Sequence, residues 1–356
     1  MKIVARFEVP YFQYLNEASE PVDTLPAFAH DKAKLCELYR LMVLVRTFDS
    51  KAIALQRTGK LGTYPSTRGQ EAVFVGIGAG MAKTDILVPY YRDIGALIQR
   101  TTTLKDILLY WGGDERGNTF PGEDFPYSVP VGSQPLHAAG VACALKLRKQ
   151  PRAVVAVCGE GATSEGDFYE AMNIAGAWQL PVVFIICNNQ WAISVPRSAQ
   201  TAAQTIAQKA IGAGFEGEQV DGNDVIAVTD RVAAALSKAR DTQTPTLLEM
   251  DCYRHSDHTT ADDARRYEPE GVRENEWSKE PINRLKIYLE KNKWWDETKE
   301  AALLTECNAK VEKAVEEYLG TAPQSPATMF DYLYAELPDI YASQRDELLA
   351  KEVAHD

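Results

Sequence analysis

The sequence of 356 residues has no apolar stretch long enough to cross a membrane and no N-terminal run that suits a signal peptide. Its formal net charge of −12 argues against nucleic acid or an anionic membrane surface as the main partner. The six cysteines form no CxxC pair and are too sparse for a disulfide scaffold, so we expect reduced thiols. These absences together predict a cytoplasmic protein with no nucleic-acid or membrane partner.

Two further features are missing. The chain has no internal repeat, and no G-x-G-x-x-G opens a helix after a strand, because the third glycine of GEGATSEG (159–166) is wrongly spaced. This spacing counts against a nucleotide-binding dehydrogenase, which we keep as an alternative. The length suits one large domain or two ordinary ones, and the 45% of hydrophobic residues supports a substantial core.

What the sequence does contain is a clear strand–helix–strand unit. The apolar runs AVVAVCG (153–159) and PVVFIICNN (181–189) are typical of buried strands, and Phe168, Ala171 and Ala175 between them recur at helical spacing. Ser164 with Asp167 predicts the N-terminal cap of this helix. A unit of under forty residues predicts two parallel strands that are buried on both faces.

The rest of the chain has weaker but readable patterns. Residues 1–30 read as an extended arm, and residues 255–270 read as an exposed, charged loop without periodicity. From about residue 276 the pattern is mostly amphipathic helix, interrupted at 320–328. Further segments predict helices over 31–60, 70–82 and 128–150, a short strand within 85–95, a strand and helix over 215–241, and a strand over 244–254. The fold class is therefore α/β.

Two oxygen-bearing side chains follow the two clearest strands. Glu160 leaves the end of the first, and Asn189 leaves the end of the second. Ligands of parallel sheets bind beyond the carboxyl ends of strands, and one crossover can place these residues side by side. Each alone could serve as a helix cap or a turn residue. Together they suit Mg²⁺ carrying a phosphate, because both offer hard oxygen donors.

The stretch GEGATSEGDFYEAMNIAGAWQLPVVFIICNNQWAIS resembles the thiamine diphosphate motif of the alpha subunit of the first component of 2-oxo acid dehydrogenases. The resemblance extends from roughly residue 35 to residue 290. It implies a thiamine diphosphate-binding fold, a mostly parallel sheet flanked by helices with a helical C-terminal region. We therefore expect an N-terminal arm at 1–34, a domain for the diphosphate and magnesium at 35–290, and a helical region at 291–356.

The resemblance also implies a cofactor site. Glu160, Asn189 and the carbonyl of Trp191 would bind Mg²⁺, with diphosphate oxygens and a water completing the shell. Tyr91 and Arg92, in VPYYRDIG, would contact the diphosphate, since an arginine fork suits phosphate oxygens. The other implied contacts are the backbone N–H groups of Gly161 and Ala162 for the diphosphate, the backbones of Val129 and Val131 for the aminopyrimidine ring, and Ser128, Ser133 and Gln134 for a potassium ion.

The charged segment YRHSDHTTADD resembles the phosphorylation loop of the family. His258 matches its essential histidine and Arg254 a loop arginine. The implied role of His258 is to bind the diphosphate or reaction intermediates and to assist transfer to the lipoyl group. Thr259 matches a position that a kinase modifies in mitochondrial relatives, and we expect it to stay unmodified here. The loop should be mobile without ligand and ordered over the diphosphate.

The implied function is that of the alpha subunit of a bacterial pyruvate-type enzyme, which decarboxylates a small 2-oxo acid. It would pass the acyl group to the lipoyl-lysine of an acyltransferase, the second component. A branched-chain 2-oxo acid enzyme is a close alternative. An alternative from a different functional class is a non-catalytic assembly protein. The resemblance further implies a beta subunit in an α₂β₂ heterotetramer, with the small residues 138–144 near a subunit contact.

Overall fold

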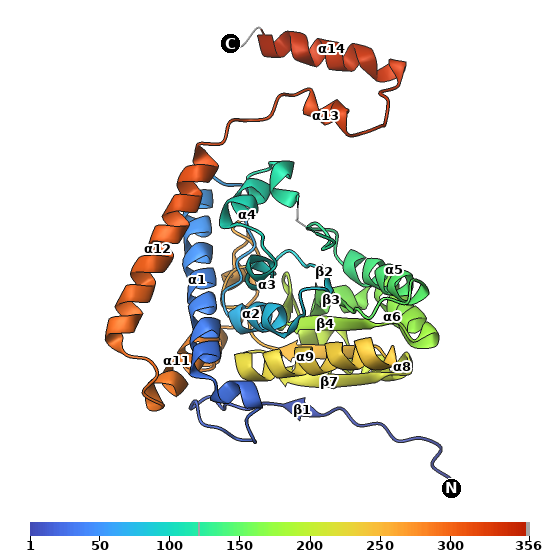
Figure 1. Cartoon of the computed structure of the whole chain (residues 1–356), viewed down its shortest axis with the longest axis vertical. Coiled ribbons are helices and arrows are strands. Elements are labelled where there is room, and N and C mark those ends of the chain that lie inside the picture. Colours follow the sequence, from blue (N-terminus) through green and yellow to red (C-terminus); the bar gives the residue numbers. More distant parts are fainter. Residues whose placement is uncertain (120–121, 354–356) are drawn as a thin grey trace.

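The computed structural model describes residues 1–119 and 122–353. Its centre is one sheet of six parallel strands in the order β1-β7-β8-β4-β3-β2 (Figure 1). The short antiparallel hairpin β5–β6 forms a separate two-stranded sheet. The strands are β1 (Tyr11–Phe12), β2 (Ile86–Val88), β3 (Val154–Gly159), β4 (Val182–Asn188), β5 (Trp191–Ala192), β6 (Val195–Pro196), β7 (Glu216–Asp221) and β8 (Thr246–Asp251).

The central strands are buried on both faces, as their continuous apolar runs predict. Alternate side chains of β3 point to opposite faces, so that Val155 and Val157 join one core cluster while Val154 and Ala156 join another. The first cluster contains residues of α2 (Glu71–Gly80), α3 (Ile94–Gln99) and α9 (Val225–Thr242). The second contains residues of α5 (Ser133–Leu147), α6 (Gly166–Trp178) and α8 (Lys209–Gly212). The sheet is thus the middle layer of an α/β/α arrangement.

A further helical layer lies outside the first face. Helix α1 (Lys32–Arg57) begins at Asp31, whose carboxylate accepts from the N–H groups of Ala33 at 2.8 Å and Lys34 at 3.3 Å. Its apolar side shares one core with α11 (Pro281–Lys291) and α12 (Glu297–Leu319), and α1 and α12 run side by side in Figure 1. The remaining helices are α4 (Leu104–Trp111), α7 (Arg197–Gln200), α10 (Val272–Trp277), α13 (Thr328–Asp331) and α14 (Asp339–Val353), with 3₁₀ turns at Ala27–His30, Glu115–Asn118, Glu160–Ser164 and Ala264–Arg266.

The two ends of the chain differ in how they join this body. The predicted extended arm is largely irregular, and β1 adds it to the edge of the sheet beside β7. At the other end, α13 and α14 stand away from the rest of the protein in Figure 1. Three residues of the predicted region 291–356, numbers 354–356, lie outside the described residues.

Two local predictions are wrong. Ser164 does not cap α6, because it belongs to the preceding 3₁₀ turn and Glu165 holds the cap position without a side-chain hydrogen bond. The segment 255–270 is irregular, as expected, but it is not simply exposed, since Arg254 and His255 at its start are buried.

All six cysteines are free. No helix within residues 1–119 and 122–353 combines the length and apolar character needed to span a membrane.

Candidate cofactor site

The site begins where β3 and β4 end. Gly159 pairs with Cys187 across the two parallel strands, so Glu160 and Asn189 leave the sheet side by side. Glu160 is 1% exposed, and its Oε2 accepts from the backbone N–H of Asn189 at 3.3 Å. Its second oxygen, Oε1, is buried without a hydrogen-bond partner. Burial raises the pKa of the Glu160 carboxyl group above its ordinary value. A cation beside Oε1 would offset that cost.

The chain after Asn189 turns back over this carboxylate. The Asn189 side-chain amide donates to Oε1 of Gln70 at 3.0 Å, and Gln190 adopts a positive φ of 75° before the β5–β6 hairpin. The hairpin brings the carbonyl of Trp191 to the site, where it accepts from Nη1 of Arg254 at 3.1 Å. A carbonyl oxygen has two lone pairs, so this bond leaves one acceptor position.

Two arginines converge on the ring of His258. Nη2 of Arg92 lies 3.2 Å from Nδ1 of His258 and donates to the His258 carbonyl at 2.7 Å. Nη1 of Arg254 lies 3.4 Å from the same Nδ1. Burial and the two guanidinium groups lower the pKa of His258 to about 3, so the ring is neutral at pH 7. Since Nδ1 faces two donors, it accepts, and the proton is assigned to Nε2.

Neither arginine forms an ion pair with a carboxylate in the part of the chain that the structure describes. Arg92 is fully buried, its ring neighbour is Tyr91 at 5.2 Å, and its Nε has no partner. Arg254 is 2% exposed, and burial together with the charge of Arg92 lowers its pKa. Two buried positive groups without a counter-ion create a site that favours an anion.

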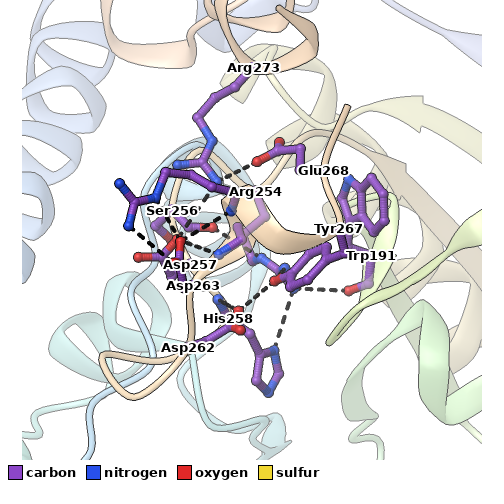
Figure 2. A network of polar contacts seen from close by, with 12 residues as sticks. Trp191, Arg254, Ser256, Asp257, His258, Asp262, Asp263, Tyr267, Glu268 and Arg273 are labelled. Atoms are coloured by element: carbon purple, nitrogen blue, oxygen red, sulfur yellow. Dashed lines mark hydrogen bonds and ion pairs between the residues drawn. The ribbon is translucent and has the colours of Figure 1, made fainter. Parts of the chain in front are cut away.

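The loop that carries His258 is tied down by polar contacts (Figure 2). Oδ2 of Asp262 accepts from the backbone N–H of His258 at 2.8 Å and from the hydroxyl of Tyr267. The same hydroxyl accepts from Nη2 of Arg254 at 2.8 Å. Figure 2 shows Arg254 between Trp191, Tyr267 and the His258 ring. The loop is therefore packed against the site, which corrects the prediction of an exposed segment.

Most of the predicted residues surround one cavity of about 170 Å³ at these strand ends. Val129 and Arg254 do not line it, but Arg254 contacts two residues that do, the Trp191 carbonyl and the His258 ring. Adding a Cβ to Gly161 would bring it within 2.7 Å of Cβ of Ala192, so the chain needs glycine there. The predicted residues that do line the cavity are Tyr91, Arg92, Val131, Gln134, Glu160, Gly161, Ala162, Asn189, Trp191 and His258.

The predicted potassium ligands lie close together at the start of α5. The hydroxyl oxygens of Ser128 and Ser133 are 2.9 Å apart, and the side-chain amide of Gln134 donates to the Ser128 carbonyl at 2.7 Å. Val129 and Val131, between them, are 47% and 57% exposed. This side of the site is open to a partner.

Several residues that shape the site were missed by sequence reasoning. Gln70 orients Asn189, and the carbonyl of Ser66 accepts from Arg92. Asp262 and Tyr267 hold the loop. The break GTYPSTRGQ after the first long helix was a signal for Gln70 and Ser66, because glycine and proline mark a loop beside a helix end. The sequence pattern did not single out Asp262 or Tyr267.

The fit to a metal-bound diphosphate can be judged from these contacts. No group of three His, Cys, Asp or Glu side chains within residues 1–119 and 122–353 is placed to hold a metal ion. The protein would give Mg²⁺ one carboxylate, one amide oxygen and one backbone carbonyl. The remaining coordination positions of the metal would be left to oxygens of an anionic ligand, for which Arg92 and Arg254 supply positive charge. The fold and the site thus define a class, namely α/β proteins that hold a metal-chelated diphosphate at the ends of parallel strands.

Comparison with known proteins narrows this class. A family model described as "Dehydrogenase E1 component" matches residues 39–327, so the chain belongs to that family. The family implies thiamine diphosphate as cofactor, and the predicted fold class and family are confirmed. Membership also rules out the alternative of a nucleotide-binding dehydrogenase.

Individual relatives match over nearly the whole chain. The "Pyruvate dehydrogenase E1 component subunit alpha" of Bacillus subtilis is 37% identical over 347 residues, which cover 96% of this chain and 93% of that protein. Proteins of the same name from Staphylococcus aureus and Staphylococcus epidermidis are each 37% identical over 354 residues, covering 98% of this chain and 94% of theirs.

Proposed function

We propose that this chain is the alpha subunit of a pyruvate dehydrogenase first component, which decarboxylates pyruvate and passes the acetyl group to the lipoyl-lysine of an acyltransferase. The relatives of that name, similar over nearly the full length, support pyruvate as the substrate. The observation that carries the proposal is the buried pair Glu160 and Asn189, with one carboxylate oxygen unpartnered. When bound, thiamine diphosphate supplies the nucleophilic carbon and the electron sink for decarboxylation.

In this proposal residues of three segments hold the cofactor. Glu160 and Asn189 offer side-chain oxygens to Mg²⁺, and Trp191 offers its carbonyl. Arg92 and Tyr91 bind diphosphate oxygens, together with the N–H groups of the turn at 160–164 that contains Gly161 and Ala162. The unpartnered Oε1 of Glu160 and the uncompensated charge of Arg92 support these roles. Residues 35–290 then form the cofactor-binding domain, between the arm at 1–34 and the helical region at 291–356.

His258 is proposed as a hydrogen-bond donor. Its neutral ring carries the proton on Nε2, because Arg92 and Arg254 occupy the Nδ1 side. An N–H group in this position can donate to the diphosphate or to an oxygen of the substrate. A hydrogen bond from this N–H group can also stabilise the negative charge that develops on sulfur when the acetyl group passes to the lipoyl group. Arg254 fixes the ring and the Trp191 carbonyl at once.

A beta subunit is needed to complete this site. Thiamine chemistry requires a carboxylic acid beside the pyrimidine ring, and the described residues contain one parallel sheet and one short hairpin, with the metal motif already on that sheet. The half-exposed Val129 and Val131 would face the pyrimidine and the partner. We therefore propose a cytoplasmic α₂β₂ heterotetramer, with potassium at Ser128, Ser133 and Gln134 and with Thr259 unmodified.

The small residues of α5 bear on this assembly in two ways. Ala138, Ala139 and Ala142 are buried within the core cluster that includes β3 and α6, so close helix packing inside the chain explains them. Gly140 has open space around it. We propose that this outer side of α5 faces another subunit.

The proposal can be tested by calorimetry on the chain assembled with its beta subunit. Thiamine diphosphate should bind only when Mg²⁺ is present, and Glu160→Gln should weaken that binding at least about 100-fold, because a metal ligand loses its charge. Glu170→Gln, an exposed acid on α6, is the matched control and should bind as the wild type does. Wild-type affinity in Glu160→Gln, with circular dichroism unchanged, would show that Glu160 is not a metal ligand.

A turnover assay separates the remaining readings. The assembly should decarboxylate pyruvate faster than 3-methyl-2-oxobutanoate, and the reverse order would favour the branched-chain alternative. The isolated chain should give no turnover, since the pyrimidine side of the site is incomplete without the beta subunit. Cofactor binding without turnover on any 2-oxo acid in the assembly would point to the non-catalytic reading.

A further inference from the structure

A second cavity, of about 540 Å³, lies on the other side of the loop that carries His258. The two cavities share no lining residue. It is lined by Thr259 and Thr260 of the loop and by Arg57 and Arg68, from the end of α1 and the segment before α2. The loop and this segment are neighbours, because the N–H of His255 donates to the Arg68 carbonyl at 3.1 Å. Among the described residues, Ile53 is the one apolar side chain in the lining, so this cavity suits a polar ligand.

Four arginines and three aspartates line this cavity, so the formal charge of the lining is 4 − 3 = +1. Arg265 pairs with Asp263, and Arg273 pairs with Glu268. Arg57 and Arg68 have no carboxylate partner in the part of the chain that the structure describes, and the Arg68 side chain donates to the hydroxyl of Ser50 at 3.2 Å. Two unpaired guanidinium groups on one wall are suited to an anion, above all to a phosphoryl group.

Buried polar atoms without partners give independent support for a ligand here. His255, which lines the cavity, is 5% exposed, and both of its ring nitrogens are buried without a hydrogen bond. The same holds for Oγ of Ser256 and for Nε of Arg68 and Arg273, which also belong to the lining. Buried polar groups in folded proteins are almost always paired, so a cluster of such atoms around one cavity points to a missing partner.

We propose that this cavity binds a phosphorylated, polyhydroxylated small molecule. Arg57 and Arg68 hold the phosphoryl group. Hydroxyl groups of the ligand bond to Ser256, Thr259 and the carboxylate of Asp257, all of which line the cavity. The volume exceeds what a bare phosphate needs, and the mixture of hydroxyl and carboxylate groups in the lining matches a sugar-like body.

Such a ligand would act on the loop. Its phosphoryl group is held by Arg57 and Arg68, and its hydroxyl groups by the segment 256–260. Binding therefore adds to the hydrogen bonds that already join the loop to the segment before α2, such as the bond from the Thr260 N–H to the Tyr64 carbonyl at 2.9 Å. His258 lies within that segment and lines the cofactor cavity. The ligand would therefore favour the packed position of the loop by its differential affinity for that state. This role is independent of which 2-oxo acid the enzyme uses.

The test uses the alpha–beta assembly saturated with thiamine diphosphate and Mg²⁺, so that the cofactor cavity cannot take up the probe. Calorimetry with D-glucose 6-phosphate should show binding, with inorganic phosphate weaker and D-glucose silent. Arg57→Gln combined with Arg68→Gln should weaken binding of the ester at least about tenfold, because a hydrogen bond to a charged group is lost at each position. Arg148→Gln, an exposed arginine outside the cavity, is the control and should leave the affinity unchanged.

Mass spectrometry separates the two sources of a phosphoryl group. The protein used in the assay must carry no covalent phosphoryl group, since a phosphorylated Thr259 would place one in the same cavity. No binding of the ester to the unmodified assembly, or equal binding by the double variant, overturns the proposal, as does a phosphoryl group found only on Thr259. Arg57→Gln alone, at an exposed position, keeps the test valid if the double variant does not fold.

Discussion

Removal of one hydroxyl group, in Tyr267→Phe, tests whether polar contacts hold the loop over the cofactor site. The Tyr267 hydroxyl donates to Asp262 and accepts from Nη2 of Arg254 at 2.8 Å. Asp262 in turn accepts from the backbone N–H of His258 at 2.8 Å. The substitution therefore removes one of the connections between Arg254 and the loop that carries the histidine, while the contacts of Arg254 with Ser256 and His258 remain.

The size of the effect follows from these two bonds. A hydrogen bond to a charged group contributes about 1.5–3 kcal/mol. Asp262 and Tyr267 are only half-buried, so water replaces part of what is lost, and we take about 2 kcal/mol for the pair. At about 1.4 kcal/mol for each factor of ten, the ratio of packed to released loop should fall roughly 30-fold.

Limited proteolysis measures that ratio. Trypsin needs several residues around Arg265 and Arg266 in extended form, so its rate under native conditions follows the released population. Cleavage at these arginines should be about 10- to 30-fold faster in Tyr267→Phe, while kcat falls and the affinity for thiamine diphosphate changes less. Tyr169→Phe is the control, because the Tyr169 hydroxyl forms no hydrogen bond within residues 1–119 and 122–353. Equal cleavage rates in the two variants would refute the reasoning.

Two further outcomes are expected. Without cofactor, His258 should stay neutral from pH 8 to pH 5, because burial and two guanidinium groups lower its pKa from 6.5 to about 3. Its folded pKa lies below the unfolded one, so this group's contribution to the free energy of unfolding is complete above about pH 6.5 and is lost as pH falls toward 3. A C–H resonance of His258 that titrates near 6.5 by NMR would contradict this. Gly161→Ala should weaken Mg²⁺-dependent cofactor binding about tenfold, because the new Cβ would displace Ala192 and the hairpin that carries Trp191. Gly166→Ala, with nothing within 4 Å, should not, and equal losses in the two variants would argue against the displacement.

The strand-end pair was predictable because it depends on local patterns. The continuous apolar runs before Glu160 and Asn189 require burial on both faces, and a crossover of some twenty residues permits only a parallel neighbour. Their meeting point follows from that register. The cap of α6 was not predictable in the same way, because the chain after Glu160 forms a 3₁₀ turn that uses Ser164.

Local patterns along the chain therefore suffice to predict the α/β class, the central parallel strands and the pair Glu160 and Asn189, since each depends on residues close together in the sequence. The contact of Arg92 and Arg254 with His258 depends on tertiary packing, because Arg92 and His258 are 166 positions apart. Tertiary packing also decides that the charged loop is packed, and that a second cavity lies behind it. Contacts of this kind depend on how the helices and strands pack against one another. The periodicity of a sequence does not indicate which distant side chains will then face each other.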